Sequence, residues 1–501
     1  MNRASVVAFC VLLNVAIPAA AGATRSSTIT ATVAVGPEVS DAPPQRFADE
    51  PARLEEILAG TDPTGSPPLP PQEASLPPPS APPGEKRPVP DYDGREDPGT
   101  NALEVLAWVP RTLLFPVHLV LEYGLRWPIV GGITFAEKHY LFKRLERIFS
   151  FRDGKTLVYP TFFSDFGLNP SVGAATTNED LFIPGNRLAA SVALWDDSWL
   201  RLAGKNDTTF LEDNTGTFTV FGEFLTRPDM PFYGVGPKTR TDDEAFFRER
   251  RLELGARIAG NLGGLSQVSF GSTFRDLRYD ERGQVPYLGD EFEARAIPGF
   301  DRGRYQLFEN RVVLTLDSRD VDTEFADGTG LRAELFGSFE IDPTNNSRNF
   351  IRWGGEAAAF YDLGQRHILA VALYSEMVEQ TGTDRVPFTE LPALGGLETM
   401  RGYLPRRFLG DSTFSAAASY RYPIWSLLDA ELFVGVGNAF DGHYEDFHPD
   451  HLYLNGGLSI RTSLAQDTGL TILWAGGTNR LDSERVRVDS VRFTVGVVQG
   501  F

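Results

Sequence analysis

The chain has 501 residues and a formal net charge of −20. This negative charge argues against general nucleic-acid binding, because the phosphate backbone attracts basic surfaces. The single cysteine, Cys10, lies near the N-terminus, so the rest of the chain holds no disulfide, no cysteine-ligated metal or cluster and no thiol nucleophile.

The N-terminus is typical of a secretory signal peptide. Arg3 supplies a positive charge, residues 4–17 form an apolar stretch too short to span a bilayer, and small residues at 19–23 offer a cleavage site. Cys10 lies inside the apolar stretch without a cleavage site before it, which argues against a lipoprotein anchor. The sequence predicts that residues 1–23 are a signal peptide and that the protein is exported.

Residues 24–100 are rich in proline, with runs at 67–71 and 77–79. Such a composition cannot bury enough apolar surface to offset the entropy lost on ordering. We therefore expect a disordered periplasmic tether. Its proline spacing leaves open a polyproline-binding partner.

Residues 101–154 carry apolar residues at helical spacing, interrupted by Pro110, Pro116 and Pro128, with basic residues opposite the later apolar positions. Short amphipathic helices are expected, either at a membrane surface or packed against the mouth of a barrel. Together with the tether, this segment could receive a periplasmic partner through residues 24–153.

From about residue 155 to residue 501 the dominant period is two. In residues 251–259, 331–339 and 458–464, apolar residues alternate with charged or small polar ones. We count sixteen such segments, and short links alternate with mostly long ones. This pattern predicts an all-β membrane protein, a 16-stranded antiparallel transmembrane β-barrel, because only a closed barrel satisfies every backbone amide in lipid. The inward positions carry arginine and glutamate, among them Arg251, Glu253 and Arg492.

Residues 394–403 read Leu-Gly-Gly-Leu-Glu-Thr-Met-Arg-Gly-Tyr, and the segments 419–424 and 432–440 follow in order. This series resembles the BamA/TamA superfamily of outer-membrane barrels, the bacterial surface antigen family. The resemblance covers residues 155–501. It implies that the sixth extracellular loop folds into the lumen and that five strands follow it. Five strand candidates do follow, at 414–424, 430–440, 454–464, 468–476 and 490–501. The implied lumenal motif consists of Gly395, Gly396, Arg401, Gly402 and Tyr403.

The C-terminus resembles the strand signal that the outer-membrane assembly machinery reads. Its matching residues are Thr494, Gly496 and Phe501. The resemblance implies contact with that machinery during biogenesis and with outer-membrane lipid afterwards, in the outer membrane of a Gram-negative bacterium.

Two departures from the family pattern stand out. In relatives the loop arginine meets acidic residues on the next two strands, and the matching lumenal positions here are Ser419 and Gly435. Glu431 shares that face but lies four residues from Gly435, roughly 13 Å along a strand. We therefore expect Arg401 to be held loosely and Gly435→Asp to stabilise the loop, unless the loop dips deeply enough for Arg401 to pair with Glu431. Residues 24–153 also lack the β-α-α-β-β pattern of POTRA repeats, which predicts a barrel-only member.

Catalytic and metal-binding interpretations find little support. His443, His448 and His451 lie in one acidic loop and are weak candidates for a divalent ion. No nucleotide or cofactor fingerprint occurs, so no cofactor and no enzymatic activity are expected. Two functions remain: translocation or insertion of protein or lipid at the outer membrane, or a passive pore or structural barrel.

Overall fold

The computed structural model describes residues 119–499, apart from residues 141–143, 145–146, 166–169, 197–198, 211–214, 282–283, 294–296, 301–302, 320–327, 345, 426–427 and 463–467. All described residues belong to one compact unit. The predicted signal peptide, the tether, the first part of the helical segment and Phe501 lie outside the described residues.

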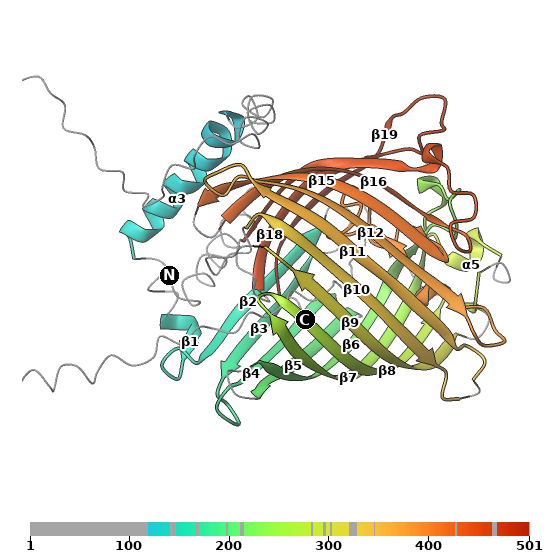
Figure 1. Ribbon diagram of the computed structural model, residues 1–501, viewed down its shortest axis with the longest axis horizontal. Coiled ribbons are helices and arrows are strands. Elements are labelled where there is room, and N and C mark those ends of the chain that lie inside the picture. Colours follow the sequence, from blue (N-terminus) through green and yellow to red (C-terminus); the bar gives the residue numbers. More distant parts are fainter. Residues whose placement is uncertain are drawn as a thin grey trace, which may run out of the picture. The chain divides into compact units, whose positions relative to one another are not determined.

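Sixteen antiparallel strands form a closed barrel, as the sequence predicts (Figure 1). Each strand pairs with its neighbour in the chain, and β19 returns to pair with β2. The strands are β2 (Thr156–Asp165), β3 (Ser171–Glu179), β4 (Asn186–Asp196), β5 (Trp199–Phe210), β6 (Gly216–Phe232), β7 (Ala245–Gly263), β8 (Ser266–Asp280), β9 (Arg304–Asp317), β10 (Gly330–Ile341), β11 (Phe350–Asp362), β12 (Ile368–Gln380), β15 (Ser412–Trp425), β16 (Leu428–Phe440), β17 (Tyr453–Thr462), β18 (Thr468–Thr478) and β19 (Val488–Gln499). A short strand, β1 (Ser150–Phe151), adds to the start of β2.

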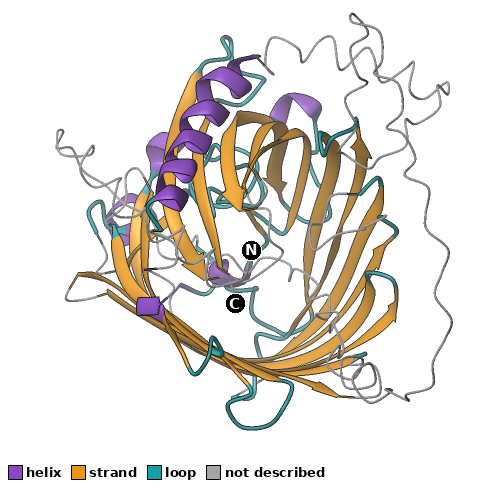
Figure 2. Ribbon diagram, turned by 90° about the vertical axis from the view of Figure 1, so that its left-hand side faces the viewer, coloured by secondary structure: helices purple, strands orange, loops and turns teal. Residues whose placement is uncertain are grey.

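The period-two pattern places apolar side chains outside and polar ones inside the ring of strands, whose interior is visible in Figure 2. On β10, Leu331 and Leu335 are 64% and 57% exposed, whereas Glu334 between them is 4% exposed. Inside, Arg332 pairs with Glu334 at 2.9 Å. This is the reverse of a soluble sheet sandwich and is typical of a barrel whose outer face contacts lipid.

The two ends of the barrel differ in the length of their connections. Residues 264–265 and 363–367 form short turns at one end, and Gly263 and Gly264 adopt φ of +113° and +57°, which favour glycine. At the other end lie the long connections 281–303, 381–411 and 441–452. In bacterial barrels the short turns are periplasmic and the long loops extracellular.

A buried apolar cluster covers part of the long-loop end. It contains Phe232 of β6, Phe247 of β7, Tyr279 of β8, Leu288 of the short helix α5 (Leu288–Glu291), and Phe388 of the loop 381–411. The Phe388 ring makes edge-to-face contacts with the rings of Phe232, Phe247 and Tyr279. The loop 381–411 is therefore packed over these strands and does not extend freely into solvent.

Helical turns precede the barrel and interrupt its loops. The π-helix η1 (Val120–Arg126) runs into α3 (Trp127–Lys138), with Pro128 in the first turn of α3, where proline is tolerated. Single-turn 3-10 helices are η3 (Thr241–Asp243), η5 (Phe388–Glu390) and η6 (Pro449–His451). Among the residues that the structure describes, no helix has both the length and the apolar character needed to cross a membrane.

Candidate functional site

The motif loop, residues 394–403, folds back within the connection of a small hairpin. Strands β13 (Ala393–Leu394) and β14 (Phe408–Leu409) pair and bring together the two ends of residues 395–407, which contain most of the motif loop. Gly395 and Gly396 adopt φ of +111° and +104°. A Cβ at Gly395 would lie 2.1 Å from the Leu404 carbonyl oxygen, so only glycine fits there.

Arg401 binds Glu431 of β16, which corrects the expectation of a loosely held arginine. Its Nη1 and Nη2 atoms donate to the two Glu431 carboxylate oxygens at 3.1 and 3.2 Å. The guanidinium also lies 3.7 Å from the centre of the Phe433 ring. The distance between Gly435 and Glu431 along β16 does not prevent this contact, because the motif loop enters the lumen deeply enough to bring Arg401 beside Glu431.

Ser419 and Gly435 are not the positions that meet Arg401. Ser419 is the Cα partner of Phe433, and Gly435 is the partner of Ala417 and Asn455. A Cβ at Gly435 would lie 3.0 Å from the Asn455 side-chain nitrogen and 3.1 Å from the Ala416 carbonyl oxygen. The acidic partner of Arg401 is therefore Glu431, on the same strand as Gly435.

Tyr403 and Gly402 fix the far side of the motif loop against β17, β18 and β19. The Tyr403 hydroxyl lies 2.8 and 2.6 Å from the carbonyl oxygens of Leu454 and Thr478, and burial raises the pKa of Tyr403 above its usual value. A Cβ at Gly402 would lie 2.3 Å from the Gly476 carbonyl oxygen. The Ser490 hydroxyl donates to the Gly402 carbonyl at 2.7 Å.

The barrel closes at a short seam between β19 and β2. Among the described residues, four Cα pairs join these strands, from Thr494 with Asp165 to Val497 with Phe162. On its other edge, β19 pairs with β18 from Thr468–Gln499 to Thr478–Val488. Pro160 of β2 has no N–H to donate, which is typical of an edge strand. Within the part of the chain that the structure describes, the seam therefore has fewer residue pairs than the neighbouring pair of β18 and β19.

A buried ion pair crosses this seam on its lumenal side. Arg492 of β19 binds Asp165 of β2, with Nε 3.0 Å from both carboxylate oxygens and Nη2 2.5 Å from Oδ2. The two side chains are 1% and 0% exposed. The Thr494 hydroxyl donates to Asp165 Oδ1 at 2.6 Å. Gly496, the other described residue of the predicted assembly signal, is the Cα partner of Phe163 across the seam.

A second set of buried charges holds the segment around Glu390, in the first half of the loop 381–411. Glu390 of η5 accepts from Arg275 of β8 at 2.7 Å and from the Tyr305 hydroxyl at 2.6 Å. Arg352 of β11 donates to the Glu390 carbonyl at 2.6 Å, and Arg406 donates to the Phe388 carbonyl at 3.1 Å. The loop 381–411 is thus bound to strands on both sides of the lumen.

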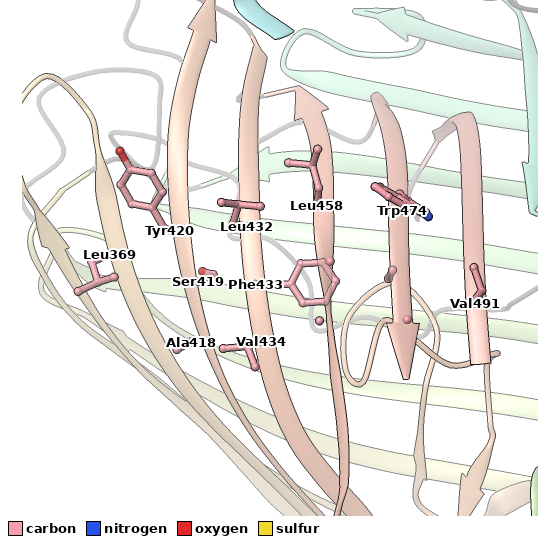
Figure 3. Close-up of a pocket in the computed structure, with 14 residues that line it drawn as sticks. Leu369, Ala418, Ser419, Tyr420, Leu432, Phe433, Val434, Leu458, Trp474 and Val491 are labelled. Carbon is pink, nitrogen blue, oxygen red and sulfur yellow. The ribbon is translucent and has the colours of Figure 1, made fainter. Parts of the chain in front are cut away.

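An apolar depression of about 760 Å³ lies in the wall formed by β12 and β15–β19. Figure 3 shows its lining side chains on neighbouring strands, among them Tyr420, Val434, Leu458, Trp474 and Val491. Val434, Trp474 and Val491 are exposed on the outer face, and small residues such as Ala418, Gly456 and Gly476 form the floor. The depression therefore opens on the lipid-facing side of β15–β19.

The three loop histidines bind different partners. His443 Nε2 lies 3.0 Å from a Glu379 carboxylate oxygen, and His451 Nδ1 lies 2.9 Å from the Asp446 carbonyl oxygen. The His448 and His451 rings are 5.7 Å apart. Within the described ranges, no group of three or more His, Cys, Asp or Glu side chains has a geometry that could hold a metal ion.

Sequence reasoning missed the acidic residues that complete these contacts. Arg492 is recognisable as an inward residue of the last strand, but its partner Asp165 is 327 residues away in the sequence. Asp165 directly follows Phe162, Phe163 and Ser164 at the end of the first strand of the barrel. A carboxylate at the end of this strand is the sequence signal that could have identified it. Glu390 lies in an irregular part of the loop, where no periodicity indicates which way a side chain points.

Comparison with known proteins agrees with this architecture. Residues 205–482, more than half of the chain, match the model of the Omp85 superfamily domain. No curated protein matches the sequence. A solved structure of BamA from Haemophilus ducreyi lacking POTRA domains 1-3 is similar at 13% identity and a TM-score of 0.47, over 68% of this chain and 70% of that one.

CdiB from Escherichia coli is similar at 12% identity and a TM-score of 0.46, over 68% of this chain and 62% of that chain. CdiB from Acinetobacter baumannii is similar at 9% identity and a TM-score of 0.43, over 69% and 60%. This chain therefore spans less than two thirds of either CdiB chain. Since the family match covers most of the barrel, the chain belongs to the Omp85 superfamily and is an outer-membrane β-barrel protein of a Gram-negative bacterium.

Proposed function

We propose that this barrel inserts or translocates protein or lipid at the outer membrane, without catalysis, by opening laterally at the seam between β19 and β2. The observation that carries the proposal is the seam itself, where the described residues form four Cα pairs and the Arg492–Asp165 contact holds the lumenal side. A strand pair joined by few backbone hydrogen bonds separates at a lower cost than a fully paired one.

Packed loops cover part of the extracellular end of the barrel. This favours release of cargo sideways into the membrane over passage straight through the barrel. The cluster around Phe388 packs loops over β6–β12, and Arg401 and Glu390 bind the loop 381–411 to the lumenal wall. Cargo that enters the lumen from the periplasm meets these packed side chains. The apolar depression on the outer face of β15–β19 extends to Val491 of β19, one of the two seam strands, and offers an apolar surface to cargo that leaves at the seam.

The contacts of η1 and α3, which precede the barrel, favour a position of these helices at the periplasmic leaflet. The Tyr422 hydroxyl, on the outer face near the short-turn end of β15, donates to the Glu122 carboxylate, which Arg126 also binds at 3.0 Å. Tyr123, Trp127 and Phe135 remain exposed. We propose that these aromatic rings lie in the membrane interface, with the tether and a periplasmic partner beyond them.

The test uses a disulfide across the seam. Ser164 and Val495 are Cα partners on the outer face, so Ser164→Cys with Val495→Cys can join β2 to β19. The matched control, Val371→Cys with Ala418→Cys, joins β12 to β15 within the fully paired wall. The protein in lipid vesicles is expected to accelerate folding of a small outer-membrane barrel. The seam disulfide is expected to abolish this acceleration until it is reduced, and the control disulfide to leave it unchanged.

Planar-bilayer conductance separates the proposal from a passive pore. Silence or rare openings are expected, and the oxidised seam disulfide should remove the openings. A steady open conductance that ignores the disulfide, together with no acceleration of client folding, would instead establish a pore.

A further inference from the structure

Arg492 contacts the motif loop as well as the seam. Its Nη1 atom donates to the carbonyl oxygens of Gly396 and of Tyr403, the latter at 3.2 Å, and lies 3.5 Å from the Arg401 carbonyl oxygen. The other two nitrogens of the same guanidinium bind Asp165. One side chain of β19 thus joins three parts of the molecule that are distant in sequence.

The motif loop presents these carbonyl groups because of its backbone conformation. The Gly396 amide donates to the Tyr403 carbonyl at 3.1 Å, which closes the turn. Left-handed φ values at Gly395 and Gly396 orient their peptide groups in a way that other residues rarely allow. The carbonyl oxygens around Arg492 Nη1 therefore converge only while the motif loop is folded in the lumen.

Because Arg492 is charged, its contacts with the motif-loop carbonyl groups and its contacts with Asp165 depend on each other. Among the described residues, Asp165 is the one carboxylate within ion-pair distance of Arg492. A buried guanidinium that loses part of its hydrogen bonds is strongly destabilised, because no water replaces the lost partners. If the motif loop leaves, Nη1 loses its acceptors, water must enter to solvate it, and the contact with Asp165 weakens. If β2 moves away, the motif loop lies beside an uncompensated positive charge.

We propose that Arg492 couples the position of the motif loop to closure of the seam. With the motif loop in the lumen, Arg492 is held in place and closes β2 onto β19. Release of the motif loop frees Arg492 and allows the seam to open. This coupling rests on the proposed function for its biological use, but it is a property of the barrel alone and is measured without any client.

The experiment measures how often the seam opens in the purified, folded full chain. Val495 is 4% exposed on the outer face of the seam, and Ile460, at 7%, lies on β17 between fully paired strands. Val495→Cys is labelled by N-ethylmaleimide when the seam opens, and Ile460→Cys is the control position. Cys10→Ser removes the natural thiol from both.

Arg401→Ala, which releases the motif loop from Glu431, is expected to speed labelling of the Val495→Cys thiol by about tenfold or more, the factor that loss of hydrogen bonds to a charged group produces. Asp165→Asn and Arg492→Lys should do the same, since Lys keeps the charge but cannot reach Asp165 and the carbonyl groups together. Ile460→Cys labelling should not change. Arg201→Lys, at a lumenal pair of β5 and β6 away from the seam, should leave both rates unchanged.

The decisive comparison is Arg401→Ala in the Arg492→Lys background. Coupling through Arg492 predicts that Arg401→Ala adds nothing further there. An equal effect in both backgrounds, or no effect of Arg401→Ala in the parent, overturns the inference. Heat-modifiable gel mobility confirms that each variant is folded, and Arg492→Lys is the milder change should Asp165→Asn fail to assemble. Failure of the vesicle assay with normal labelling results would contradict the proposed function and leave the coupling intact.

Discussion

Arg401→Ala should substantially destabilise the folded barrel. The substitution removes two charge-assisted hydrogen bonds to Glu431, at 3.1 and 3.2 Å, and a cation–π contact with Phe433. Hydrogen bonds to a charged group contribute about 1.5–3 kcal/mol, and an interior cation–π contact about 1 kcal/mol more. Glu431 keeps Arg461 at 3.6 Å and the Ser459 hydroxyl at 3.5 Å, which limits the penalty of leaving its charge buried. The expected loss of unfolding free energy is about 2–4 kcal/mol.

The measurement is equilibrium urea unfolding of the purified barrel, followed by tryptophan fluorescence and heat-modifiable mobility. Arg487→Ala is the matched control, because Arg487 is 70% exposed and lies 3.7 Å from Asp489. That substitution should change the unfolding free energy by less than about 0.5 kcal/mol. A double-mutant cycle with Glu431→Gln should give a coupling energy of about 1.5–3 kcal/mol. A loss below about 0.5 kcal/mol for Arg401→Ala, or additive effects in the cycle, would refute the assigned pairing.

Four further outcomes are expected. Gly435→Asp should not stabilise the barrel in the urea assay, because a side chain there meets a neighbouring amide and carbonyl at about 3 Å and Arg401 is already paired. Leu335→Arg, on the lipid face, should cost about 2–4 kcal/mol and lower the fraction of heat-modifiable barrel, whereas Ser269→Arg, on the lumenal face, should have little effect. Deletion of Phe501 should reduce outer-membrane levels on fractionation if the terminal strand is read as an assembly signal. Burial, and after it nearby carboxylates, raise the pKa of Asp441, so the ionised form is disfavoured in the folded loop. Asp441→Asn should therefore stabilise the folded barrel against urea at pH 7. This gain should vanish on acidification to about pH 4, where the aspartate is protonated in the folded state and largely so in the unfolded state.

The sequence could predict the barrel because alternation is a local property. Each strand must present apolar residues to lipid and polar residues to the lumen, and this requirement appears in every strand independently. Residues 330–341, with Leu331 and Leu335 outside and Glu334 inside, can be assigned without knowing any other strand. The motif loop was recognisable for a similar reason, since its glycines and Arg401 are contiguous.

Partners across the lumen and the seam could be decided only by the tertiary structure. The position that meets Arg401 depends on how deeply the loop 381–411 enters, and that depth is set by Glu390, Phe388 and Tyr403 against several different strands. Parity alone indicated that Ser419, Gly435 and Glu431 face the lumen, and it gave no information on the depth that selects among them. The contact of Arg492 with Asp165 needs the stagger at which the last strand meets the first. That stagger is set by closure of the whole barrel, because tilt and register accumulate over all sixteen strands and no single segment contains them.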